Sequence, residues 1–160
     1  MSRLPLLLAL GFVLARVAMT QAQTLVLTPD ETKIVLAKGA PLPVEQAAGL
    51  LQLWLRKATG STTGFAVVNA VPSATDADVV AIVLNDPAVV ATEAVRALPE
   101  DGFVLSRNGR QLSIAGSEPG GVYYGAVEFL SRVAGVRFYM PTELFTSLPD
   151  NSRIDPFPEI

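Results

Sequence analysis

The stretch that decides the fold runs from Asp101 to Pro141 and reads DGFVLSRNGRQLSIAGSEPGGVYYGAVEFLSRVAGVRFYMP. It predicts a β-hairpin, because alternating runs flank Asn108-Gly109, and an Asn-Gly pair is the strongest short hairpin signal in a sequence. A helix is predicted next, capped at its start by Ser117 and ended by Gly135. A return strand over 136–140 then ends at Pro141. One window therefore predicts three strands and a helix.

Upstream of this window, the apolar residues alternate between the strand period of two and a helical period near 3.6. A long apolar stripe predicts a helix from Pro43 to Gly60, and a shorter helix is expected between Asp86-Pro87 and Pro99. Short β-branched or apolar runs predict strands over 24–28, 33–37, 65–69 and 79–84. This order predicts an α/β (α+β) fold: a mixed, largely antiparallel β-sheet with about three helices packed on it.

The first 22 residues have the features of a signal peptide. Arg3 provides a positive start, and the apolar run over 4–14 is shorter than the ~20 residues that a permanent membrane span needs. Thr20 and Ala22 are small residues at the positions that a signal peptidase accepts, so we expect cleavage after Ala22 and a secreted or periplasmic protein. Arg16, just behind the apolar run, leaves an uncleaved anchor as the alternative.

The remaining chain is long enough for one domain with a genuine core. We expect a signal peptide over 1–22, one α/β domain over 23–141, and a linker over 142–160. The linker is expected because its residues show no apolar period and include Pro149, Pro156 and Pro158. After removal of the signal peptide no stable membrane span is expected.

Composition excludes several kinds of chemistry. The absence of cysteine excludes disulfides and thiolate sites, and the absence of histidine excludes Ser-His-Asp triads and imidazole-bound metals within this chain. The formal net charge of −3 becomes −5 when Arg3 and Arg16 leave with the leader, and no basic cluster is present, which argues against a nucleic-acid partner. No cofactor or metal site is predicted.

Glycoside hydrolysis requires two carboxyl groups that face each other across the sugar. The acidic residues of this chain are expected in turns or on exposed helix positions instead, with Glu118 in a first helical turn and Glu128 paired with Arg132. We therefore predict no catalytic residue. The acidic residues expected in turns are Asp76, Asp78, Glu100 and Asp101.

The glycine-rich segment 116–121 lies between a strand and a helix but lacks the Lys-Ser/Thr of a nucleotide-binding loop. Its glycines are expected to let the helix approach the sheet closely.

Among the aromatic residues, Trp54 and Phe129 fall on apolar stripes and are expected in the core. Tyr123 and Tyr124 are adjacent on a helix and point about 100° apart, so both cannot face the core. We expect Tyr124, Arg137 and Tyr139 to be domain-interface residues.

Five segments in this order resemble one kind of domain. They are Ala58-Thr59-Gly60, Asp101-Gly102-Phe103, Leu112 to Gly116, Gly121 to Gly125 followed by Glu128-Phe129-Leu130, and Gly135 to Pro141. The set resembles the non-catalytic amino-terminal domain of glycoside hydrolases of the family 67 α-glucuronidase and family 20 β-hexosaminidase type, and of related uncharacterised glycosidase-like proteins. The resemblance covers nearly all of the mature chain.

The resemblance implies a hexosaminidase domain-2-like fold that precedes a TIM barrel, with the catalytic carboxylates in that barrel. No catalytic motif of the family has a matching position here, and we expect residues 142–160 to lead toward a barrel that this chain lacks. The predicted function is a non-catalytic accessory domain of an exported carbohydrate-active enzyme, without hydrolytic activity on its own. Its expected partners are a catalytic TIM barrel, in cis or adjacent, and a polysaccharide.

Two alternatives remain: a stand-alone carbohydrate-binding or protein-interaction module, and a complete small enzyme.

Overall fold

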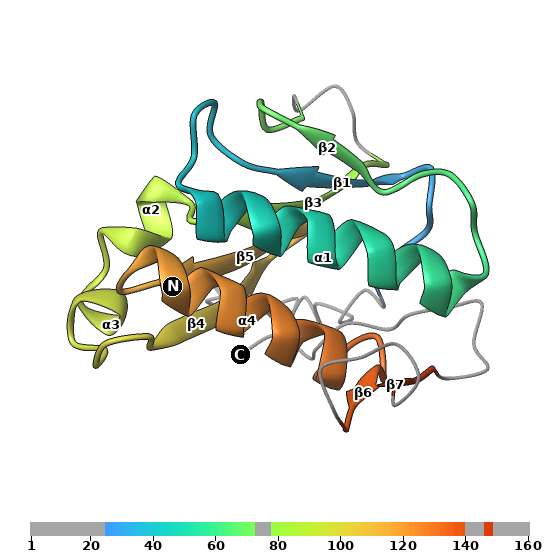
Figure 1. Cartoon of the computed structure of the whole chain (residues 1–160). Helices are drawn as coiled ribbons and strands as arrows, with labels where there is room; N and C mark the ends of the chain where they lie inside the picture. Colours follow the sequence, from blue (N-terminus) through green and yellow to red (C-terminus); the bar gives the residue numbers. More distant parts are fainter. Residues whose placement is uncertain (1–24, 73–77, 140–145, 149–160) are drawn as a thin grey trace, which may run out of the picture.

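The computed structural model describes residues 25–72, 78–139 and 146–148 (Figure 1). A five-stranded sheet has the strand order β2-β1-β3-β5-β4, and a second sheet consists of β6 and β7. The strands are β1 (Thr32–Val35), β2 (Ala66–Val68), β3 (Val80–Leu84), β4 (Phe103–Asn108), β5 (Gln111–Gly116), β6 (Arg137–Phe138) and β7 (Thr146–Ser147). The helices are α1 (Leu42–Thr59), α2 (Pro87–Val90), α3 (Glu93–Arg96) and α4 (Pro119–Arg132).

The mixed α/β sheet with helices packed on it confirms the predicted fold class. The sheet is mixed, as predicted, but it is not largely antiparallel, because three of its four pairings are parallel: β1 with β2, β1 with β3, and β3 with β5. The β4–β5 hairpin is antiparallel, as expected. The connection explains the parallel pairing of β1 with β2. Helix α1 lies between these strands in the chain and returns it to the end of the sheet at which β1 begins, so β2 runs in the same direction as β1.

Helices α1 and α4 lie side by side on one face of the sheet (Figure 1). The stripe predicted for α1 is the buried one, and Gly60 ends the helix with φ 65°, its N–H donating to the carbonyls of Arg56 and Lys57. The core lies between these helices and the sheet. Its largest fully buried side chains include Phe65, Phe129, Leu27, Ile34, Leu51, Leu55, Ile82, Leu112, Ile114 and Leu130.

Glycines let α4 lie close to the sheet, as the sequence predicted. A Cβ on Gly121 would collide with the carbonyl oxygen of Gly102. A Cβ on Gly125 would lie 2.7 Å from Cγ2 of Ile114 and 3.3 Å from Cβ of Phe103. Since real Cβ atoms do not approach this closely, the packing of α4 on β4 and β5 depends on these two glycines.

The expected helix between Asp86 and Pro99 is divided in two. Asp86 caps α2, its Oδ1 accepting from the backbone N–H of Ala88 at 2.9 Å. Thr92 has extended backbone angles, φ −74° and ψ 152°, and separates α2 from α3. The valines of this stretch favour helix weakly, which agrees with two single turns in place of one longer helix.

The hairpin is present, but its turn lies one residue later than the Asn-Gly pair suggested. Asn108 pairs with Gln111, so Gly109 and Arg110 are the two central residues. Gly109 has φ 57°, whereas Arg110 is not among the described residues with positive φ. A glycine at the first central position is what a type II′ turn requires, so glycine alone decides the position of the turn.

Two strand predictions need correction. Of the expected strand over 24–28, Leu27 forms an isolated bridge and its side chain is fully buried, while Thr24 lies outside the described residues. The expected return strand is shortened to β6, and Met140 lies outside the described residues. Strand β6 pairs with β7 in the two-stranded sheet and does not join the five-stranded sheet. Leu25 and Leu27 are buried, and so is Val136, so packing against the core gives both runs a strand-like pattern although neither joins the five-stranded sheet as a strand.

Two further local predictions differ from the structure. Ser117 does not cap α4, since the residue at the N-cap is Glu118, which has no side-chain capping bond. The Ser117 hydroxyl donates to the carbonyl of Pro99 at 2.8 Å. Thr146–Ser147, inside the expected linker, form β7. The signal peptide over 1–22 lies outside the described residues, and among those that are described no helix has the length and apolarity to cross a membrane.

Candidate domain interface

The segment after α4 is attached to α1 by an aromatic contact. The rings of Trp54 and Phe138 meet edge to face, with centroids 5.4 Å apart and planes at 88°. Trp54 is buried, as predicted, and the Nζ atom of Lys57 lies 4.7 Å from the centre of its ring. Phe138 is half-buried and packs against the main core. Strand β6 is therefore held on the carboxyl-terminal half of α1.

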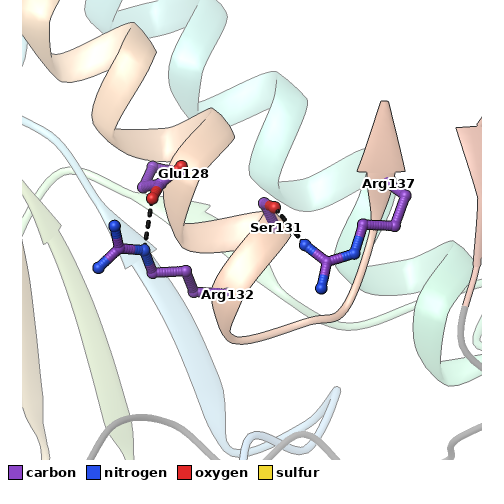
Figure 2. Close-up of polar contacts among 4 residues, drawn as sticks. All are labelled: Glu128, Ser131, Arg132 and Arg137. Atoms are coloured by element: carbon purple, nitrogen blue, oxygen red, sulfur yellow. Dashed lines mark hydrogen bonds and ion pairs between the residues drawn. The ribbon is translucent and has the colours of Figure 1, made fainter. Parts of the chain in front are cut away.

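Polar contacts hold the same segment against the end of α4 (Figure 2). Nη1 of Arg137 donates to Oγ of Ser131 at 2.9 Å. One turn away, Nε of Arg132 donates to Oε1 of Glu128, which confirms the ion pair predicted from their spacing. Arg137 itself is exposed, and its contact is with a hydroxyl, so its charge is available at the surface.

Tyr139 is the most exposed of the large hydrophobic residues described in this region. Its relative exposure is 71%, although it directly follows the anchored Phe138. Arg137 and Tyr139 flank Phe138 and are both exposed. Leu148, just past β7, is 39% exposed. The structure therefore places Arg137 and Tyr139 on one exposed segment with a fixed attachment.

Tyr124 lies elsewhere. It is 52% exposed on the first half of α4, whereas Tyr123 is half-buried and packs against the core. The two rings meet edge to face with centroids 6.2 Å apart, and only one of them is turned inward, as the sequence predicted. Tyr124 and Arg132 are eight residues apart in sequence, which is about 12 Å along the helix axis. Tyr124 is thus not brought together with Arg137 and Tyr139.

Sequence reasoning missed two exposed apolar residues on α1. Leu42 is 65% exposed at the start of the helix, and Leu53 is 44% exposed on its outer side. Leu53 lies between the buried Leu51 and Trp54 in the sequence, so a count of apolar residues does not distinguish it from them. Its position outside the helical stripe of buried residues could have predicted its exposure. Leu53 and Tyr124 both belong to the outer surface of the helix layer.

The acidic residues lie where solvent reaches them. Asp78, Glu100, Asp101 and Glu118 are exposed, and Glu128 is paired with Arg132. Asp76 lies outside the described residues. Within the described ranges, no group of three or more acidic side chains could hold a metal ion. The candidate contact surface thus consists of exposed aromatic and apolar side chains and the exposed guanidinium of Arg137.

The chain is similar to a known domain family and to a solved structure. The family model described as "Glycosyl hydrolase family 20, domain 2" matches residues 15–135, a range that includes the end of the expected signal peptide. No curated protein matches the chain. A solved GH138 enzyme targeting pectin rhamnogalacturonan II is similar with a TM-score of 0.39 and 19% identity, over 63% of this chain. The chain spans 13% of the length of that enzyme.

The family match bears on the resemblance noted in the sequence. It supports the family 20 part, while the resemblance to family 67 α-glucuronidases and to uncharacterised glycosidase-like proteins stays a prediction. The matched range covers most of the chain and all of the five-stranded sheet. This chain therefore belongs to the domain 2 family of glycosyl hydrolase family 20.

Proposed function

We propose that this chain is the non-catalytic accessory domain of an exported glycoside hydrolase and that it packs against a catalytic TIM barrel, in cis or adjacent. Family membership supports a glycoside hydrolase accessory domain, because domain 2 of family 20 normally lies beside such a barrel. The contact surface includes Arg137 and Tyr139 on the segment that follows α4. Tyr124 and Leu53, on the outer surface of the helix layer, are a separate second part of the proposed contact.

The exposure of Tyr139 is the observation that carries the proposal. Its ring is 71% exposed, while the preceding residue is fixed to α1 through Trp54. A large aromatic side chain on an anchored backbone loses little conformational freedom when a partner covers it. Tyrosine and arginine are also the residue types enriched in the buried centres of interfaces. Arg137 and Tyr139 therefore suit a partner with an apolar surface and a hydrogen-bond acceptor.

The absence of hydrolytic activity is the second part of the proposal. It rests on the positions of the described carboxylates, since glycoside hydrolysis needs two carboxyl groups that face each other across the sugar. Most of these carboxylates are exposed, while the half-buried Asp86 caps α2 and Glu128 pairs with Arg132. The purified mature chain is expected to release no product from aryl glycosides. Turnover that disappears on substitution of a single carboxylate would contradict this.

Export is the third part, and the signal features of residues 1–22 support it. The mass of the protein recovered from cell fractions tests it. We expect a secreted or periplasmic product that begins at Gln23. A cytoplasmic product that retains Met1 to Ala22 would contradict export, and a membrane-bound product of full mass would favour the anchor.

The docking surface is tested with the catalytic barrel encoded in the same reading frame or by an adjacent gene. Tyr139→Ala and Arg137→Ala are each expected to weaken binding of the mature chain to that barrel by about tenfold or more, as measured by titration calorimetry. Val71→Ser is the matched control, because Val71 is 52% exposed but follows β2, away from the proposed surface. Equal losses in all three variants, or in none, would contradict the proposal.

A stand-alone carbohydrate-binding module is the second candidate, favoured by the exposed rings of Tyr124 and Tyr139. Aromatic rings stack on the apolar faces of sugars. Retention of the isolated chain on xylan or chitin, lost in Tyr124→Ala or Tyr139→Ala, would favour this candidate over docking. Lack of retention, together with barrel binding, would favour docking.

A further inference from the structure

The Asn108-Gly109 pair lies where the hairpin turn does not require its asparagine. The two central residues of the turn are Gly109 and Arg110, and Asn108 is the last residue of β4, where it pairs with Gln111. The side chain of Asn108 is exposed. Within the part of the chain that the structure describes, no hydrogen bond involves its amide group. An exposed asparagine amide therefore directly precedes a glycine.

The backbone nitrogen of Gly109 lies next to that amide. Gly109 has φ 57° and no side chain, and a Cβ built on it would meet nothing within 4 Å. Its N–H donates none of the backbone hydrogen bonds described for turns and loops. The bonds that close the hairpin belong to the terminal pair, Asn108 and Gln111. No described neighbour therefore crowds Gly109 or occupies its N–H.

We propose that Asn108 is a site of spontaneous deamidation, with water as the co-reactant. The Gly109 nitrogen gives up its proton to water or hydroxide and attacks Cγ of the Asn108 side chain. A five-membered succinimide ring forms as the bond from Cγ to the amide nitrogen breaks, and that nitrogen leaves as ammonia. Water then opens the ring at one of its two carbonyl carbons. The products are aspartate and isoaspartate, in which the backbone continues through the side-chain carbonyl.

The other two asparagines of the described ranges are less suited to this reaction. Asn69 donates from Nδ2 to the carbonyl of Leu36 at 3.3 Å, and an alanine follows it. The Oδ1 atom of Asn85 is buried, and an aspartate follows it. A side chain on the following residue hinders attack by its nitrogen, whereas glycine has none. Asparagine is a thermolabile residue in proteins, and at position 108 nothing described protects it.

The folded hairpin slows the reaction. Ring closure requires the side-chain Cγ to reach the next backbone nitrogen, which an extended strand end does not permit, so the end of the hairpin must first open. Arg110 opposes this opening, because its guanidinium donates to the carbonyls of Asp78 and Val79. Its own carbonyl accepts from the N–H of Ala81 at 3.1 Å. The turn is thus attached to the start of β3, and deamidation is slower in the folded chain than in the denatured one.

Deamidation changes both the charge and the length of the hairpin. One carboxylate replaces one neutral amide, so the formal net charge of the whole sequence falls by one, from −3 to −4. Isoaspartate adds one carbon to the backbone of β4, which lengthens it by about 1.5 Å. The pair of Asn108 with Gln111 then loses its register with the contacts of Arg110. The hairpin of an aged protein therefore differs irreversibly from that of a new one.

Peptide mapping of the mature chain, kept folded at mildly alkaline pH, tests the proposal. Chymotrypsin is the suitable protease, because trypsin would cut at Arg107 and Arg110 beside the site. The peptide that contains residue 108 should gain the mass difference between a hydroxyl and an amino group and should separate into two products. Methylation by an isoaspartyl methyltransferase identifies the isoaspartate product. The peptides that contain Asn69 and Asn85 are internal controls and should stay unchanged.

Three variants separate the chemistry from the folding. Asn108→Gln is the matched control, because its longer side chain would have to form a six-membered ring, and it should stay unconverted. Gly109→Ala, measured in urea so that its backbone strain plays no part, should react about tenfold more slowly than the unmodified chain in urea. Arg110→Ala removes the guanidinium contacts with residues 78 and 79, and its folded chain should react about tenfold faster.

An unconverted residue 108 in the folded chain, equal conversion of all three asparagines, or a folded Arg110→Ala variant that reacts no faster would each overturn the proposal. None of these measurements involves Arg137 or Tyr139, so the result is independent of docking on a barrel.

Discussion

Phe138 lies edge-on against Trp54, and this contact joins the chain after α4 to the helix that follows β1. The two residues are far apart in sequence, and their ring centroids are 5.4 Å apart. Trp54 also contributes to the main core, so the contact connects the exposed segment to the interior of the domain. The position of Arg137 and Tyr139 therefore depends on an aromatic pair within this chain.

Phe138→Ala is expected to lower the free energy of unfolding by about 1–3 kcal/mol, since it removes a half-buried ring and an aromatic pair. Trp54 is the only tryptophan in the sequence, so its fluorescence reports on this site. Urea titration should show a lower midpoint, and the folded variant should emit at longer wavelength. Tyr139→Ala, next to it but exposed, serves as the control and should leave both quantities unchanged.

Gly125→Ala is expected to destabilise the domain by about 1–3 kcal/mol, although alanine favours helix over glycine. The added methyl group would lie 2.7 Å from Cγ2 of Ile114, so α4 must move away from the sheet. The control is Gly49→Ala on the exposed side of α1, where nothing lies within 4 Å of the new Cβ. That variant should be stabilised by up to about 1 kcal/mol, so thermal melting should shift in opposite directions.

Thr32→Val is expected to raise the free energy of unfolding by about 1 kcal/mol. Thr32 is fully buried, and its Oγ1 has no hydrogen-bond partner among the described residues, so its hydroxyl is desolvated without compensation. The control is Thr59→Val, whose hydroxyl donates to the carbonyl of Leu55 at 2.8 Å and which should not be stabilised. Denaturant midpoints of both variants provide the measurement. A less stable Thr32→Val would show that its hydroxyl has a partner.

Glu128→Gln is expected to change the free energy of unfolding by less than about 0.5 kcal/mol. The side chains of Arg132 and Glu128 are 64% and 33% exposed, so water screens their attraction. The difference from the unmodified chain should vanish at about 1 M salt, where the Debye length is about 3 Å. Urea titrations at low and high salt measure it, and an effect that persists in high salt would show that the pair is more buried than its exposure indicates.

Helix α1 and strand β3 could be predicted because their signals are local. The stripe from Val44 to Ala58 and the glycine cap at Gly60 specify a helix without reference to the rest of the chain. The uninterrupted apolar run of β3 is typical of a strand covered on both faces, and all five of its residues are buried. Such patterns depend on a few adjacent residues, so a single sequence contains them.

The order and direction of the strands could not be predicted in this way. No residue of β1 specifies that its neighbours are β2 and β3, because a parallel pairing depends on the path of the connecting chain. The same holds for the candidate interface. The sequence led to the expectation that Tyr139 is an interface residue, but the contact of Phe138 with Trp54 joins distant parts of the chain. Exposure of Leu53 likewise depends on tertiary packing.

The central position of β3 bears on the order in which a newly synthesised chain can fold. Strand β3 lies between β1 and β5 in the sheet. In a nascent polypeptide that ends at Leu84, β3 therefore has a neighbouring strand on one side only. The last arriving strand of the sheet, β5, fills that flank and leads directly into α4. The domain can therefore fold completely only after α4 has been synthesised, and shorter fragments of the chain are not expected to be stable.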